Sequence, residues 1–105
     1  MHGKKQRPVF WAGQTVVLRY MVTDEDPAST FTPEDVTEVT FRVRNTRAGL
    51  DATLSMTGGD VSLSGGEFVA NYFAERAGQY TVTATARDAD GKRAVDVTEF
   101  EVREP

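Results

Sequence analysis

The stretch that decides the fold runs from Ala77 to Gly91 and reads AGQYTVTATARDADG. From Tyr80 to Ala86 every second residue is apolar or small, and the residues between them are threonines. Such alternation is typical of a β-strand that buries one face and leaves the other in water. The stretch ends in Asp88-Ala89-Asp90-Gly91, whose Asp and Gly residues favour a turn. It therefore predicts a long, half-buried strand followed by a hairpin.

Gly78 stands two residues before Tyr80, at the mouth of this strand. In immunoglobulin-like (Ig-like) sandwiches a tyrosine at such a position is buried, and its hydroxyl bonds to backbone a few residues upstream. This arrangement is known as a tyrosine corner. We therefore expect Tyr80 to be buried and to donate a hydrogen bond to nearby backbone.

Further segments of the chain alternate in the same way or form short apolar runs between turn residues, and none shows a helical period. Short strands separated by turns at roughly 8–12-residue spacing are typical of a β-sandwich. The sequence predicts an all-β fold, an Ig-like β-sandwich of about seven antiparallel strands. The other expected strands are residues 8–11, 14–22, 36–44, 52–56, 67–73 and 93–103, with a strand fragment at 61–63.

The last expected strand changes parity along its length. Val95 and Val97 are odd-numbered, whereas Phe100 and Val102 are even-numbered. A β-bulge near residues 98–99 would place all four side chains on the core side. The alternative is a strand that crosses between the two sheets at this point.

The length of 105 residues is enough for one domain with its own core. We expect a basic N-terminal arm and edge segment over residues 1–12 and the sandwich domain over residues 13–105. The absence of cysteine excludes disulfides and thiolate metal sites. No apolar run approaches the roughly 18 residues that cross a bilayer, and Pro8 and Gln14 interrupt any start that resembles a signal peptide. We therefore expect no leader and no membrane partner.

The net charge of −4 is unevenly distributed along the chain. Because Lys4, Lys5 and Arg7 lie in the arm, residues 8–105 hold nine basic and sixteen acidic residues, a net charge of −7. An acidic body argues against nonspecific binding of nucleic acid. The basic arm is either a solvated terminus or a docking arm that becomes ordered on a partner.

The residue types needed for catalysis do not form a recognisable set. His2 is the only histidine and lies in the arm, so neither a Ser-His-Asp triad nor a two-histidine metal site can be assembled. We therefore predict no catalytic residues, no cofactor and no enzyme activity.

Acidic residues gather in the loops that we expect at one end of the sandwich. Three interpretations remain open: solvated turn residues, an acidic face for a basic partner, and a calcium site. The calcium site would use two Asp-x-Asp pairs, Asp24 with Asp26 and Asp88 with Asp90. The acidic residues assigned to this end are Asp24, Glu25, Asp26, Glu34, Asp35, Asp60, Asp88 and Asp90.

Three aromatic residues are of interest outside the expected core strands. Phe10 and Trp11 belong to the short apolar run near the N-terminus, and Phe31 is isolated in the long loop over residues 23–35. We favour a role for Trp11 in capping the core, with an exposed anchor for a neighbouring subunit as the alternative. Phe31 is a possible second anchor, because long loops in compact domains are often functional.

Three stretches resemble small Ig-like domains in virion proteins of tailed bacteriophages: GQTVVLRYMVTD over residues 13–24, VTEVTFRVR over 36–44, and AGQY followed by ARDADG within 77–91. Such domains occur in head decoration, neck, tail-tube and baseplate components. The resemblance implies a non-catalytic structural protein that docks in many copies on capsid, neck or tail subunits. It implies a virion location, with assembly in the host cytoplasm.

Docking of this kind would use edge-strand pairing or an aromatic anchor, helped by the arm. The alternative is an Ig-like module that binds glycans or a host surface through its acidic end. The predicted partner-binding residues are Lys4, Lys5, Arg7, Phe10, Trp11 and Phe31.

Overall fold

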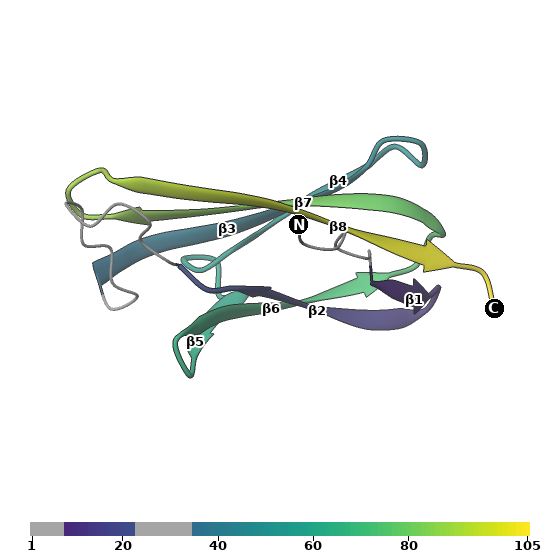
Figure 1. Cartoon of the computed structure of the whole chain (residues 1–105), viewed down its shortest axis with the longest axis horizontal. Helices are drawn as coiled ribbons and strands as arrows, with labels where there is room; N and C mark the ends of the chain where they lie inside the picture. The colour runs from purple at the N-terminus through teal and green to yellow at the C-terminus, as the bar shows by residue number, and fades with distance from the viewer. Residues whose placement is uncertain (1–7, 23–34) are drawn as a thin grey trace, which may run out of the picture.

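The computed structural model describes residues 8–22 and 35–105, which form eight β-strands. Figure 1 shows the strands in two layers, as the sequence predicts for a β-sandwich. Within the described ranges, no helix is long and apolar enough to pass through a membrane. The strands are β1 Val9–Trp11, β2 Gln14–Tyr20, β3 Val36–Asn45, β4 Leu50–Ser55, β5 Val61–Ser64, β6 Glu67–Ala74, β7 Gly78–Asp88 and β8 Arg93–Arg103.

One sheet has five strands in the order β1-β8-β7-β3-β4, and the other has three in the order β2-β6-β5. All pairings are antiparallel except that of β1 with β8, which is parallel. The Ig-like sandwich is therefore confirmed, and the expected all-antiparallel arrangement is wrong at its first strand. β1 and β2 are consecutive in the sequence, yet they belong to opposite sheets.

The predicted central strand, β7, lies between β3 and β8 in the larger sheet. Its inward residues lie opposite those of β3, with the small Ala84 opposite the large Phe41 and Val82 opposite Val43. The small-residue face of β7 is therefore buried, as its sequence pattern predicts.

The tyrosine corner is also confirmed. Tyr80 is 0% exposed, and its hydroxyl donates to the carbonyl of Arg76 at 2.6 Å. Its ring stacks on that of Phe100 with ring centroids 4.8 Å apart. Asn45, the last residue of β3, has a buried side chain that reaches the same turn. Its Nδ2 donates to the carbonyl of Ala77 at 3.3 Å. Two side chains therefore fix the connection between β6 and β7.

The β-bulge predicted for the last strand is absent. β7 and β8 pair in unbroken register from Gly78 with Val102 to Arg87 with Arg93. The parity of β8 is therefore constant, and Val95 and Val97 lie on the outer face with 55% and 57% of their surface exposed. They lie opposite threonines of β7, and such β-branched cross-strand pairs stabilise a sheet without burial in the core.

Candidate functional site: a groove between the two sheets

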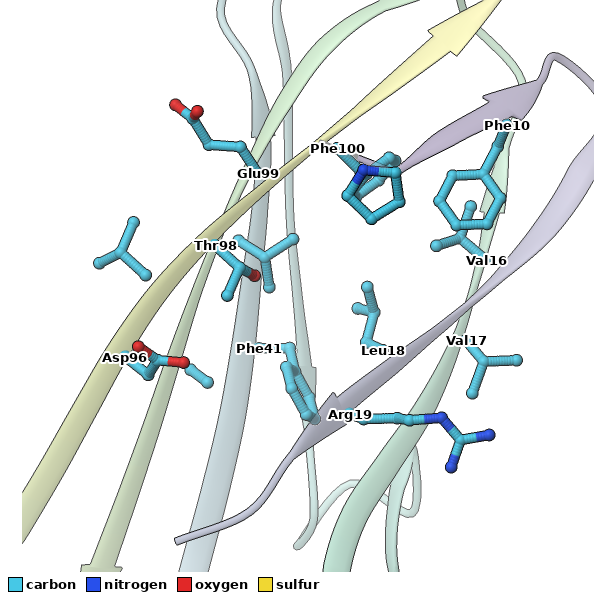
Figure 2. A pocket seen from close by; sticks show the side chains of 14 residues that line it. Phe10, Val16, Val17, Leu18, Arg19, Phe41, Asp96, Thr98, Glu99 and Phe100 are labelled. Carbon is cyan, nitrogen blue, oxygen red and sulfur yellow. The ribbon is translucent and has the colours of Figure 1, made fainter. Parts of the chain in front are cut away.

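A groove of about 860 Å³ opens between β2 of the smaller sheet and β8 of the larger one. Figure 2 shows its apolar interior, to which β2 contributes Val16 and Leu18 and β3 contributes Phe41. Phe10 of β1 and Phe100 of β8 close one end, and their rings meet edge to face with centroids 5.7 Å apart. The groove is therefore an extension of the core that is open to solvent.

The groove lies between two strand edges that are open within the described ranges. β2 pairs with β6 on one side, and no strand in the described ranges pairs with its other side. β1 covers β8 only along residues 101–103. Residues 93–99 of β8 therefore form a second open edge within the described part of the chain.

The β8 wall of the groove is polar. Asp96 and Thr98 have the same parity as buried Phe100, so they face the smaller sheet, yet both are exposed because nothing in the described ranges covers them. Burial raises the pKa of the Tyr20 hydroxyl, and the negative charge of Asp96 raises it further. The carboxylate of Asp96 therefore faces the groove within electrostatic reach of β2.

The outer side of β2 is different. Val17 and Arg19 point away from the groove in Figure 2. The guanidinium of Arg19 lies 3.3 Å from the Glu67 carboxylate on the neighbouring strand β6. The only charged side chain of β2 is therefore paired within its own sheet.

The two aromatic residues of the short strand β1 lie on opposite faces of the sheet. Its parallel register with β8 turns Phe10 inward and leaves Val9 and Trp11 on the outer face, with Trp11 53% exposed. The prediction that Trp11 caps the core is therefore wrong, because the residue that fills this position is Phe10. Trp11 is exposed, as the alternative of an anchor requires, and its role as an anchor stays a prediction. Its backbone is fixed by a 2.8 Å hydrogen bond from its N–H to Oε1 of Gln14.

Asp88, one of the proposed calcium ligands, is used by the hairpin itself. Its Oδ1 accepts the backbone N–H groups of Asp90 at 3.0 Å and Lys92 at 2.9 Å. In the part of the chain that the structure describes, no group of three potential ligands could hold a metal ion. Asp24 and Asp26 lie outside the described residues, so the complete calcium set stays a prediction.

The acidic end is described only in part, because Asp24, Glu25, Asp26 and Glu34 lie outside the described residues. Asp35 and Asp88 share this end, because β3 and β7 pair there from Val36 with Asp88. Asp60 lies in the connection from β4 to β5, as expected. This connection begins toward the same end of β3, since Met56 donates to the carbonyl of Val39 at 2.9 Å and β4 is antiparallel to β3. Oδ2 of Asp60 accepts the N–H of Ser55 at 3.2 Å.

The remaining predicted contact residues are outside the described ranges. They are Lys4, Lys5, Arg7 and Phe31.

The polar β8 wall was missed at the sequence level. Asp96 and Thr98 share even parity with Phe100 and Val102, so an unbroken strand would have placed all four on one face. The two exposed valines suggested a bulge instead, because apolar side chains were expected to face inward.

Sequence comparisons add no family: no family model and no curated protein matches this chain. Among solved structures, the chain is similar to a candidate glycoside hydrolase from Bacteroides vulgatus ATCC 8482, with 11% identity and a TM-score of 0.55. The match covers 95% of this chain but spans only 17% of that protein. At this identity the likeness extends to the fold alone.

Proposed function

We propose that this chain is a non-catalytic structural protein of a tailed-phage particle, an Ig-like module that docks on capsid, neck or tail subunits. The observation that carries the docking role is the exposure of Trp11 on a backbone held in place on both sides. The proposed virion location, and assembly in the host cytoplasm, come from the sequence resemblance described above.

Trp11 has the properties of an interface anchor. Tryptophan is enriched among the few residues that supply most of the binding energy in protein interfaces. Its backbone N–H is bonded to Gln14, and the next residue, Ala12, donates to the carbonyl of Arg103 at 2.8 Å. A side chain on such a fixed backbone loses little conformational entropy on binding.

The surroundings of Trp11 favour a protein partner. Val9 lies on the same face, 45% exposed, so the two side chains form an apolar pair at the end of the larger sheet. The neighbouring positions of β8 are Glu101 and Arg103, which form an ion pair with Nε and Oε2 3.0 Å apart. An apolar centre beside charged groups is the usual composition of a protein interface.

The test uses phage particles produced from the genome that encodes the chain. We expect quantitative mass spectrometry of purified particles to find the chain in many copies per particle, and deletion of residues 1–11 to reduce that number. Absence of the full-length chain from purified particles would reject the proposed function. Unchanged incorporation of the shortened chain would remove the arm and β1 from the docking mechanism.

A glycan-binding or host-surface-binding module is the second candidate. The exposed indole of Trp11 favours it, because sugar rings bind against aromatic faces beside polar groups. A glycan array separates the two: binding that Trp11→Ala abolishes, together with absence from particles, would replace the first candidate.

A further inference from the structure

We propose that the groove between β2 and β8 receives an extended segment of another virion protein, which pairs with the open edge of β2. The inward side chains of this segment are apolar, apart from one Lys or Arg that reaches Asp96. This inference rests on the proposed function and adds a second contact, distinct from Trp11.

The edge of β2 is suited to accept a strand. Its pairing with β6 is regular over all seven residues, from Gln14 with Ala74 to Tyr20 with Phe68. β2 contains no proline, glycine or bulge, and Arg19 is already paired with Glu67. Proteins usually protect edge strands by such interruptions or by charges. The edge of β2 lacks this protection.

The open edges of β8 and β5 are less suitable. The uncovered part of β8 carries charged side chains, Asp96 and Glu99 among them. β5 has only four residues and ends at the Gly65-Gly66 turn. Short strands and charged residues both discourage the addition of a further strand. The edge of β2 therefore fits a partner strand better than that of β8 or β5.

The walls of the groove define the inward face of the segment. Val16, Leu18 and Phe41 line the groove, although only 2%, 6% and 1% of their surface is exposed. A strand places every second side chain on the same face. A segment paired with β2 would therefore project alternate residues into the groove. In peptide recognition by strand addition, backbone pairing supplies affinity and pockets for alternate side chains supply specificity.

The negative charge of Asp96 indicates which kind of side chain the segment carries at one position. Asp96 is exposed, faces the smaller sheet and lies close enough to raise the pKa of Tyr20. Opposite charges across an interface fix orientation and register, so a Lys or Arg is expected here. Residues 1–7 of this chain contain basic residues that could pair with Asp96. They lack the apolar side chains that would contact the groove walls, because Met1 is their only large apolar residue.

The probe is the synthetic peptide acetyl-Thr-Val-Thr-Lys-Thr-Val-Thr-Val-Thr-amide, whose even positions form the inward face. Its control carries Glu in place of Lys. We expect the Lys peptide to bind about tenfold more tightly and to slow amide hydrogen exchange along β2. Asp96→Asn should reduce this preference. Equal affinity of the two peptides, or protection of amides outside β2 only, would overturn the proposal.

Two variants test the groove with little risk to folding, because both positions are exposed. Thr98→Trp places a large ring in the groove, whereas Val95→Trp, on the same strand, places it on the outer face. We expect the first to weaken binding of the Lys peptide at least tenfold and the second to change it less than twofold. Equal effects of the two variants would contradict insertion into the groove.

The same variants separate this inference from the proposed function. Normal incorporation of Thr98→Trp into particles would retain the docking role and reject the groove as its second contact. Peptide binding that appears only after deletion of residues 1–7 would assign the groove to the chain's own arm. Self-association in solution that Thr98→Trp abolishes would assign it to a second copy. Either result would overturn the proposal.

Discussion

The side-chain amide of Asn45 and the backbone of Gly78 fit together because position 78 has no Cβ. A Cβ built at Gly78 would lie 2.8 Å from Nδ2 of Asn45, and the φ angle of this glycine is +134°. Asn45 is 1% exposed, with Oδ1 accepting the N–H of Ala48 and Nδ2 donating to the carbonyl of Ala77. This amide therefore has little room to move aside.

Gly78→Ala should lower the free energy of unfolding by about 2–3 kcal/mol, since it combines an unfavourable φ with a steric clash. The control is Gly49→Ala. Position 49 also has a positive φ, +72°, but has nothing within 4 Å of an added Cβ. Its cost should be about 1 kcal/mol. Urea denaturation measures both, and equal losses would show that the contact with Asn45 is unimportant.

Tyr80→Phe should lower the free energy of unfolding by about 1–2 kcal/mol, because the variant removes the hydroxyl that donates to the carbonyl of Arg76. The ring and its stacking on Phe100 are retained, so the fold should persist. Thermal unfolding followed by circular dichroism measures the loss. A variant as stable as the wild type would mean that water satisfies this carbonyl equally well.

Glu38 should make stability depend on pH in the acid range. The Thr57 hydroxyl donates to its Oε2 at 2.6 Å and lowers the pKa of this carboxyl from its ordinary value of 4.5, and backbone N–H groups of Thr57, Val39 and Met56 act in the same direction. Because the folded pKa is the lower one, this stabilisation is present above about pH 4.5 and is lost as pH falls through the folded value.

The measurement compares wild type with Glu38→Gln by chemical denaturation between pH 7 and pH 3. We expect the wild type to lose its advantage over this variant on acidification. Glu38→Ala, which leaves these donors without the carboxylate, should cost about 1–2 kcal/mol at neutral pH. A constant difference between wild type and Glu38→Gln over the whole range would contradict the assignment.

Calcium should leave the melting temperature unchanged. Oδ1 of Asp88 already accepts two backbone N–H groups of the hairpin, so calcium binding there would compete with the turn. We expect the same melting temperature in millimolar calcium and in EDTA. A rise with calcium that Asp88→Ala removes would restore the calcium site and give the acidic end a structural ion.

The alternating strands and the tyrosine corner could be predicted because each follows from local rules. The strict alternation of β7 fixes which residues face inward, and the Gly-x-Tyr spacing fixes the corner at Tyr80. The sheet that a strand joins depends on long-range pairing, which alternation does not encode. The pattern of residues 52–56, for example, does not indicate that β4 pairs with β3 in the larger sheet.

The candidate groove could not be predicted for a related reason. It depends on two edges that no strand of the described ranges covers, and a single sequence does not show which edges stay open. Glu38 illustrates the same limit, because its hydrogen-bond partners include residues of a distant segment. Its contacts with Met56 and Thr57 join residues eighteen and nineteen positions apart.

The central claim is docking through Trp11, and the most direct measurement compares two exposed aromatic residues on opposite sheets. Trp11 lies on β1 and Phe73 on β6, 53% and 56% exposed. The number of copies of Trp11→Ala and of Phe73→Ala in purified particles is counted by quantitative mass spectrometry. We predict that Trp11→Ala reduces it at least tenfold and that Phe73→Ala leaves it within twofold of the wild type, with both variants folded. Full incorporation of a folded Trp11→Ala variant would contradict the claim.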